Sequence, residues 1–217
     1  MDAVCFDMDG VLVDSEDYWV PYEEEHLFPE LGLPDLDVDE ITGMNYREIY
    51  AYLLETYGIE MDRDDFLAWY DDAATRIYGE EVQLLDGAED LIAELGDHGV
   101  TVTLVSSSPH HWIDVVLERF DLEFDAVISA DAIDGPGKPE PVVYTHAAEE
   151  IDVDPTRAVA VEDSVHGIES AHRAGMHVVG FRHGRTDDTD RSQADFVARS
   201  PTDLRDHLLA RADGPNV

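Results

Sequence analysis

Near its start the chain reads Ala3-Val4-Cys5-Phe6-Asp7-Met8-Asp9-Gly10-Val11-Leu12-Val13-Asp14-Ser15, an apolar run that leads into two aspartates spaced two residues apart. The first four of these residues are continuous and apolar, as in a strand buried on both faces of a parallel sheet. Gly10 allows the chain to turn sharply and to approach a ligand closely. Because ligands of open α/β sheets bind at the carboxyl ends of the strands, we expect Asp7 and Asp9 to face a ligand crevice.

Short apolar runs recur along the chain, with amphipathic helical patterns between them. Four of these runs are rich in β-branched residues or alanine: Val100–Val105, Ala126–Ile128, Ala158–Val161 and His177–Phe181. Strands that alternate with helices are typical of doubly wound α/β proteins. The sequence therefore predicts an α/β fold with a Rossmann-like parallel sheet sandwiched by helices, and the charged stretch Arg182–Gln193 is interpreted as a loop.

The connection after the first strand is unusually long. About seventy residues follow Val13 before the next helix of the core, where such a connection normally takes a handful of residues. The inserted segment is rich in helical patterns. We predict that residues 15–81 form an all-helical cap domain inserted into a core domain made of residues 1–14 and 82–217.

Sequence patterns within this insert indicate where two helices begin. Asn45 and Glu48 form a capping-box pattern, and the amphipathic stretch that follows ends at Gly58. Asp62 precedes a second stretch whose apolar residues recur at helical spacing: Phe66, Tyr70, Ala73, Ala74 and Ile77. These patterns predict two helices in the cap.

The chain is strongly acidic. Its 217 residues include 13 Lys+Arg and 51 Asp+Glu, which gives a formal net charge of −38. Binding to phosphate backbones or anionic lipid headgroups requires clustered lysine and arginine, so this balance argues against nucleic-acid and membrane partners. Hydrophobic residues make up 44% of the chain, which is enough apolar material to build a core.

Lysine is almost absent, since Lys138 is the only lysine and the other twelve basic residues are arginines. A chain dense in acids and nearly free of lysine is typical of a halophile, in which concentrated salt screens a heavily charged surface. An ordinary acidic protein with few lysines by chance is the alternative interpretation. If lysine was replaced wherever the surface allowed, Lys138 is expected at a position where a compact ammonium group has a function that the planar guanidinium group of arginine cannot perform.

Cysteine content and hydropathy bear on the location of the protein. Cys5 is the only cysteine, so an intrachain disulfide is excluded, and its place in the first apolar run favours a core residue. The N-terminus shows no basic leader pattern, and no stretch of about eighteen apolar residues occurs. We expect a cytoplasmic protein, and nothing in the sequence requires more than a monomer.

Polar groups also follow the later strands. The second strand leads into Ser106-Ser107-Ser108, whose hydroxyls and backbone N–H groups suit phosphate oxygens. The segment Gly137-Lys138-Pro139-Glu140-Pro141 places a cation at the start of a predicted helix, with a proline at its first position. The fourth strand leads into Glu162-Asp163-Ser164, whose two carboxylates suit a hard cation such as Mg²⁺. Nucleophile, hydroxyls, cation and metal ligands are thus expected at one edge of the sheet.

The order and spacing of these segments resemble the four-motif signature of the haloacid dehalogenase superfamily. The similarity is to the phosphoglycolate phosphatase and β-phosphoglucomutase-like branch, which carries a helical cap. The motifs are Asp7–Glu16, Ser106, Gly137–Pro139 and Glu162–Gly167. The resemblance covers nearly the whole chain and implies a Mg²⁺-dependent phosphatase that hydrolyses a small phosphorylated metabolite through an aspartyl-phosphate intermediate.

The resemblance also implies a role for each motif residue. Asp7 would attack phosphorus, and Asp9 would protonate the leaving oxygen and then activate water. Ser106 and Lys138 would hold the transferring phosphoryl group, which agrees with the positioning and charge neutralisation that phosphoryl transfer needs. The implied Mg²⁺ ligands are Asp7, the backbone carbonyl of Asp9, Asp163 and Glu162, the last directly or through water.

Further candidates lie beside these motifs. Gly10 and Ser107 are candidate phosphate-binding or substrate-binding residues. In the cap, Gly43–Arg47 resembles the specificity loop of the family, so Asn45 and Arg47 are candidate substrate contacts, and Arg47 could reach a second anionic group. The alternative for Arg47 is an ion pair with acids on a solvated helix face.

Two other functions are left open. A β-phosphoglucomutase-like phosphotransferase resembles the chain closely, but that branch typically has a histidine where Trp19 and its neighbours lie, which favours transfer to water. A phospho-accepting signalling module also uses strand-end acids, a hydroxyl and a lysine, but its acid pair precedes the acceptor aspartate and it lacks a long helical insert. Pro139 after Lys138 excludes a phosphate-binding P-loop, which requires serine or threonine there.

Overall fold

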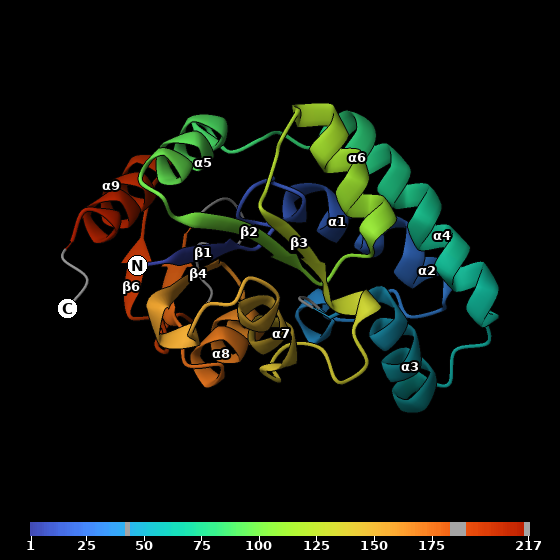
Figure 1. The fold of residues 1–217 in the computed structure, drawn as a ribbon. Coiled ribbons are helices and arrows are strands. Elements are labelled where there is room, and N and C mark those ends of the chain that lie inside the picture. Colours follow the sequence, from blue (N-terminus) through green and yellow to red (C-terminus); the bar gives the residue numbers. More distant parts are fainter. Residues whose placement is uncertain (42–43, 183–189, 215–217) are drawn as a thin grey trace.

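The computed structural model describes residues 1–41, 44–182 and 190–214. Six parallel strands form one sheet in the order β3-β2-β1-β4-β5-β6 (Figure 1). The strands are β1 (Ala3–Phe6), β2 (Thr101–Ser106), β3 (Ala126–Ser129), β4 (Ala158–Glu162), β5 (His177–Phe181) and β6 (Phe196–Ala198). The predicted α/β fold with a Rossmann-like parallel sheet is confirmed.

Strand β1 lies at the centre of the sheet, and all of its residues are buried. It pairs in parallel with β2 on one side and with β4 on the other, so Phe6 lies opposite both Leu104 and Val161. This register brings the carboxyl ends of the three strands to the same edge of the sheet. The polar residues that follow these strands therefore start from adjacent backbone positions.

Helices cover both faces of the sheet (Figure 1). On one face lie α5 (Ala88–Asp97), α6 (His110–Phe120) and α9 (Pro201–Ala212), and on the other lie α7 (Val142–Glu150) and α8 (Val165–Arg173). Successive side chains of a strand point to opposite faces, so Val4 and Phe6 join one apolar cluster while Ala3 and Cys5 join the other. Burial raises the pKa of the Cys5 thiol to about 12, as expected of a core residue.

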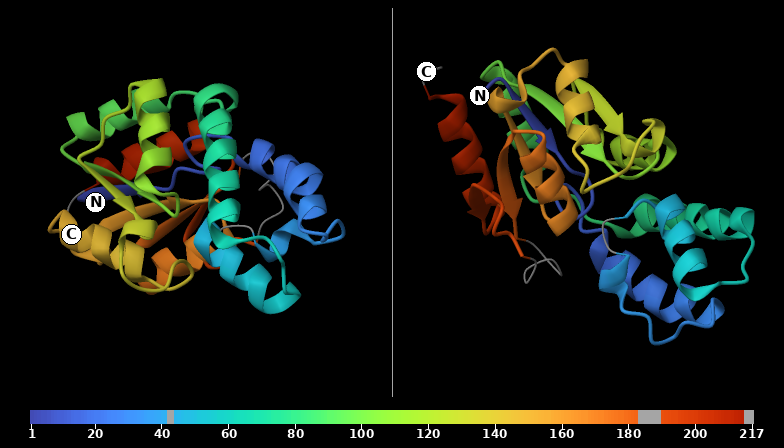
Figure 2. Two further views of the ribbon diagram at one scale, coloured as in Figure 1. Left: turned by 90° about the vertical axis from the view of Figure 1, so that its right-hand side faces the viewer. Right: turned by 90° about the horizontal axis from the view of Figure 1, so that it is seen from below.

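The helical insert between β1 and α5 forms a lobe beside the sheet, which the right-hand view of Figure 2 shows clearly. We refer to residues 15–81 as the cap. Its elements are α1 (Glu16–Tyr22), the π-helical turn η1 (Glu23–Leu27), α2 (Phe28–Glu30), the 3₁₀ turn η2 (Val38–Glu40), α3 (Tyr46–Tyr57), α4 (Arg63–Arg76) and the π-helical turn η3 (Ile77–Glu81). The capping box of Asn45 and Glu48 at the start of α3 is present, and Asp62 caps α4, as predicted.

Some elements differ from the sequence-based expectations. The edge strand β6 has three residues, which is too short to show a period, and Pro141 lies at the N-cap of α7 and not at its first helical position. Two 3₁₀ turns complete the core: η4 (Ala130–Ala132) and η5 (Pro155–Arg157).

Residues 183–189 of the predicted loop lie outside the described residues. Within the described ranges, no helix is both long and apolar enough to cross a membrane.

Candidate active site

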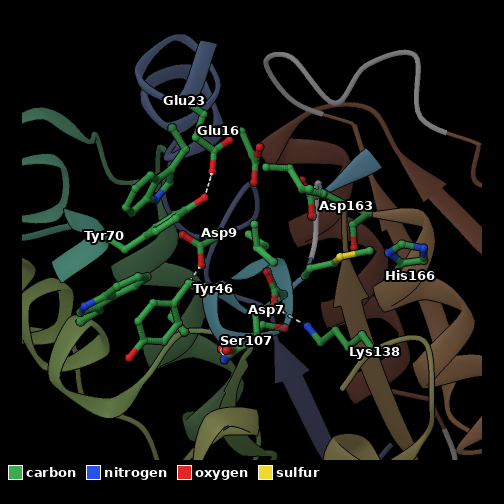
Figure 3. A pocket seen from close by; sticks show the side chains of 18 of the residues that line it. Asp7, Asp9, Glu16, Glu23, Tyr46, Tyr70, Ser107, Lys138, Asp163 and His166 are labelled. Carbon is green, nitrogen blue, oxygen red and sulfur yellow. Dashed lines mark hydrogen bonds and ion pairs between the residues drawn. The ribbon is translucent and has the colours of Figure 1, made fainter. Parts of the chain in front are cut away.

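A cavity of about 520 Å³ opens at the carboxyl edge of the sheet, between the strand ends and the cap. Figure 3 shows side chains from both parts of the molecule directed into it. Five of the predicted site residues line it from the core: Asp7, Asp9, Ser107, Lys138 and Asp163. Stretches of chain that are far apart in the sequence therefore meet in one site.

Lys138 joins two of the strand ends. Its Nζ donates to Asp7 Oδ1 at 2.7 Å and to Glu162 Oε1 at 2.6 Å, and the Tyr144 hydroxyl donates to the same Glu162 oxygen at 2.6 Å. Burial alone would lower the pKa of Lys138, but the Asp7 and Glu162 carboxylates outweigh burial and raise it above its usual value. The only lysine of the chain is therefore a charged group inside the cavity.

Three buried carboxylates beside this lysine fit a metal ion. Asp7, Glu162 and Asp163 each offer an oxygen atom, and these atoms lie within 4.8 Å of one another. Burial, followed by the neighbouring Glu162 carboxylate, raises the pKa of Asp163 well above its usual value. One ammonium group cannot neutralise three carboxylates, and carboxylate oxygens are ligands that Mg²⁺ takes. The residues present therefore fit a hard divalent cation.

Glycines make room for two of these carboxylates. Gly10 has a φ of +72°, and a Cβ atom at this position would lie 1.9 Å from Asp163 Oδ2. A Cβ atom on Gly167 would lie 2.0 Å from the carboxyl carbon of Glu162. Gly10 is not among the residues that line the cavity, so its contribution is to let Asp163 approach.

Replacing Gly10 by alanine is expected to lower the affinity for Mg²⁺ by about tenfold or more, because the new methyl group displaces Asp163. Calorimetric titration with MgCl₂ measures this change. Gly32→Ala is the matched control, since Gly32 has a similar φ of +74° but nothing within 4 Å of its Cβ position. Both variants carry the same backbone strain of about 1–2 kcal/mol. Equal metal affinity in the two variants would contradict the role assigned to Gly10.

Three hydroxyl groups hold Asp9. Ser15 donates to Asp9 Oδ1 at 2.6 Å, Tyr78 donates to the same oxygen at 2.7 Å, and Ser108 donates to Oδ2 at 3.0 Å. The Tyr78 oxygen in turn accepts from Trp19 Nε1 at 3.0 Å. The orientation of the Asp9 carboxylate is therefore fixed from both the cap and the core.

The serines at the end of β2 point in different directions. Ser107 lines the cavity, whereas the Ser106 side chain is fully buried and is not part of the lining. The Ser106 hydroxyl accepts from the Ser108 backbone N–H at 3.0 Å, which fixes the turn after the strand. The predicted direct contact between Ser106 and phosphate therefore stays a prediction.

The two substrate contacts predicted in the cap, Asn45 and Arg47, differ in where their side chains lie. Asn45 lines the cavity, and its side-chain N–H donates to the backbone carbonyl of Ser107 at 2.7 Å. Arg47 is not part of the lining, and its Nε donates to Asp131 Oδ1 at 2.7 Å. The structure thus fits the ion-pair interpretation of Arg47 and does not bring this side chain to the cavity. Gly43, the first residue of the predicted specificity loop, lies outside the described residues.

Sequence reasoning assigned no role to the cap wall of the cavity, which includes Glu16, Glu23, Tyr70 and Tyr78, or to Trp112, which lines the cavity from the core helix α6. The helical spacing of Tyr70 is equally typical of a residue in a helical core. Burial and nearby acids, above all Asp9, raise the pKa of Glu16 to about 8, which marks it as part of the same charged site. These residues can be recognised as part of the site only from their neighbours in the folded structure, because no local sequence motif identifies them.

The fold and the site define an α/β enzyme whose clustered carboxylates follow the strands of a doubly wound sheet. A family model described as haloacid dehalogenase-like hydrolase matches residues 4–181. The chain belongs to this family, and the resemblance found in its sequence is confirmed.

Individual relatives match over most of their length. Hexitol phosphatase B of Escherichia coli K12 is 32% identical over 196 residues, which cover 82% of each chain. β-Phosphoglucomutase of Bacillus subtilis is 28% identical over 226 residues, which cover 96% of this chain and 94% of the relative. The crystal structure of CbbY from Rhodobacter sphaeroides in complex with phosphate matches with a TM-score of 0.79 and 26% identity, covering 99% of this chain and 100% of that chain.

Proposed function

We propose that the protein is a Mg²⁺-dependent phosphatase that hydrolyses a small phosphorylated metabolite through an aspartyl-phosphate intermediate on Asp7. The observation that carries this proposal is the Lys138 ammonium group, bonded to both Asp7 and Glu162. A carboxylate can attack an anionic phosphate ester only where cations offset the charges of both. Membership of a hydrolase family and the similarity to hexitol phosphatase B support the same reaction.

The proposed reaction has two steps. In the first, an Asp7 oxygen attacks phosphorus, a new O–P bond forms as the ester O–P bond breaks, and Asp9 gives a proton to the leaving oxygen. In the second, Asp9 takes a proton from water as the water oxygen attacks phosphorus, which releases orthophosphate and restores Asp7. Lys138 stabilises the charge on the phosphoryl oxygens, and Ser106 and Ser107 orient them.

Asp7, Glu162, Asp163 and the backbone carbonyl of Asp9 would hold the Mg²⁺ ion. When bound, Mg²⁺ supplies positive charge to the phosphoryl oxygens as they approach the carboxylate. The clustering of the Asp7, Glu162 and Asp163 oxygens within 4.8 Å of one another supports this assignment.

A phosphotransferase that moves phosphate between positions of a sugar is the second candidate, because one relative is a β-phosphoglucomutase. Transfer to water is favoured by Trp19, which occupies the region where mutases of this kind typically have a histidine. Its indole N–H donates to Tyr78, and Tyr78 donates to Asp9. The acid/base group is therefore restrained through the Trp19 and Tyr78 side chains in place of a histidine.

Removal of divalent ions with EDTA is expected to lower phosphate release from p-nitrophenyl phosphate by about 100-fold or more, and added MgCl₂ is expected to restore it. The assay is run in molar KCl, since we also propose that the acidic surface needs screening by salt. Undiminished hydrolysis after EDTA treatment would contradict a Mg²⁺ requirement. With a sugar phosphate as substrate, an isomerised product formed in place of inorganic phosphate would identify a mutase.

A further inference from the structure

The cap wall of the cavity carries a buried acid that the proposed reaction does not use. Glu23, on the turn η1, is 7% exposed and lines the cavity. The Tyr70 hydroxyl donates to Glu23 Oε1 at 2.7 Å, and Figure 3 shows this contact on the side of the cavity away from Lys138. Within the part of the chain that the structure describes, Tyr70 is the only hydrogen-bond partner of the Glu23 carboxylate. The second oxygen, Oε2, has no donor among the described residues and is not one of the fully buried polar atoms, so it keeps contact with the cavity.

Because Glu23 as a whole is largely buried, few water molecules can reach this oxygen, and a hydrogen-bond donor in the cavity would stabilise it. Burial raises the pKa of Glu23 to about 7, with a smaller opposing effect from the Tyr70 hydrogen bond. A hydroxyl group of a molecule bound in the cavity would supply such a donor to Oε2. We refer to Glu23 and Tyr70 together as the Glu23–Tyr70 pair.

Aromatic rings lie beside this pair. The centroids of Trp19 and Tyr70 are 5.4 Å apart, those of Trp19 and Trp112 are 5.6 Å apart, and those of Tyr70 and Trp112 are 6.4 Å apart. All three rings line the cavity. The parts of these rings that line the cavity offer apolar surface to C–H groups, while the carboxylate accepts from O–H groups. An aromatic wall combined with a hydrogen-bond acceptor suits a polyhydroxylated carbon chain or ring.

The charges around the cavity argue against a second anionic group on the substrate. Among the described residues that line it, Lys138 is the only lysine or arginine, and it is already bonded to Asp7 and Glu162. Arg47, the predicted partner of a second anion, is paired with Asp131 outside the lining. A carboxylate or second phosphate on the leaving group would instead meet the acids of the cap wall.

We propose that the Glu23–Tyr70 pair binds a hydroxyl group of the leaving group, so that the substrates are monophosphates of neutral polyhydroxylated compounds such as alditols and sugars. This inference rests on the phosphatase proposed above. In the complex, a leaving-group hydroxyl donates to Glu23 Oε2, and the carbon skeleton packs on Trp19 and Trp112. Bisphosphates and phosphocarboxylates are discriminated against because their second charge has no cation beside it in the described part of the cavity.

The first test compares kcat/KM for a hexitol monophosphate with kcat/KM for p-nitrophenyl phosphate, which has no hydroxyl groups. Glu23→Gln removes the charge of the acceptor at constant size, and this kcat/KM ratio is expected to fall by about tenfold or more. Tyr70→Phe frees Glu23 from its anchor and is expected to lower the ratio in the same direction. Glu40→Gln is the matched control, because Glu40 accepts from Tyr52 and Tyr57 on the exposed surface of the cap, away from the cavity.

The second test measures binding without turnover, in chains that also carry Asp7→Asn to remove the proposed nucleophile. The dissociation constant of the hexitol monophosphate, determined by calorimetry, is expected to rise about tenfold or more in Glu23→Gln and to stay within about twofold in Glu40→Gln. An unchanged ratio and an unchanged dissociation constant in folded Glu23→Gln and Tyr70→Phe would overturn the inference, as would wild-type preference for a bisphosphate or phosphoglycolate. Hexitol-phosphate binding that depends on Glu23 without hydrolysis of any ester would instead overturn the phosphatase proposal alone.

Discussion

Replacing Asp7 by asparagine is expected to lower the rate of phosphate release by about 10⁴-fold or more. The asparagine amide has the size of the carboxylate, and its oxygen can still accept from the Lys138 ammonium group, which lies 2.7 Å from Asp7 Oδ1. It is, however, too weak a nucleophile to attack phosphorus. Because Asp7 is 6% exposed and the substitution conserves volume, we expect the variant to fold. The decrease in rate can then be attributed to the loss of the carboxylate nucleophile and not to unfolding.

The measurement is inorganic phosphate release at saturating substrate and MgCl₂, together with thermal unfolding of each protein. Asp72→Asn, which changes an exposed acid of α4, is the matched control and is expected to keep wild-type turnover. In rapid-quench experiments the wild-type chain is expected to carry a phosphoryl group that hydroxylamine removes, and Asp7→Asn is expected to carry none. Turnover by Asp7→Asn within about tenfold of wild type would contradict a nucleophilic role for Asp7.

Most of the core could be predicted from the sequence because its strands are buried on both faces. Continuous apolar runs such as Ala158–Val161 can be recognised without knowledge of their neighbours. The edge strand β6 is short and only partly buried, with Phe196 and Val197 not fully enclosed, so it lacks this pattern. Its pairing with β5 depends on contacts that a local pattern does not contain.

The site was predictable where its residues directly follow a strand. Asp7 and Asp163 are examples, because parallel strands place such residues at one edge whatever the details of packing. The cap residues lack this constraint. Arg47 pairs with Asp131, which is 84 positions away in the sequence, and Glu23 pairs with Tyr70, which is 47 positions away. Such partners are set by how the cap lies on the core, which neither charge nor helical spacing reveals.

The net charge of −38 opposes the binding of an anionic substrate over long distances. Salt weakens this repulsion, since the Debye length at about 1 M is about 3 Å. Screening of the surface does not supply the attraction that the reaction needs at the phosphoryl group. In the proposed reaction that attraction would come from buried groups such as Lys138, which salt screens much less. The chemical identity of this one cation therefore matters more than its contribution to the overall charge.

Replacing Lys138 by arginine is expected to lower kcat/KM by about 10²–10³-fold, although the charge is kept. Oxygens of Asp7 and Glu162 converge on one nitrogen atom at 2.7 and 2.6 Å, and the ring centroid of Tyr144 lies 5.4 Å from it. A guanidinium group is planar and larger, so it cannot place one donor at this point without moving the carboxylates. The displaced Asp7 would no longer be aligned with phosphorus.

The matched control is Arg76→Lys, the reverse exchange in an exposed ion pair with Glu81, where the Arg76 side chain is 62% exposed. Exposed pairs contribute about 0–1 kcal/mol, so activity is expected to stay within about twofold. Thermal unfolding of Lys138→Arg shows whether overpacking, which typically costs about 1–3 kcal/mol, leaves the protein folded at the assay temperature. Wild-type kcat/KM in folded Lys138→Arg would show that the site requires only a positive charge. The persistence of one lysine among twelve arginines would then need an explanation outside the active site.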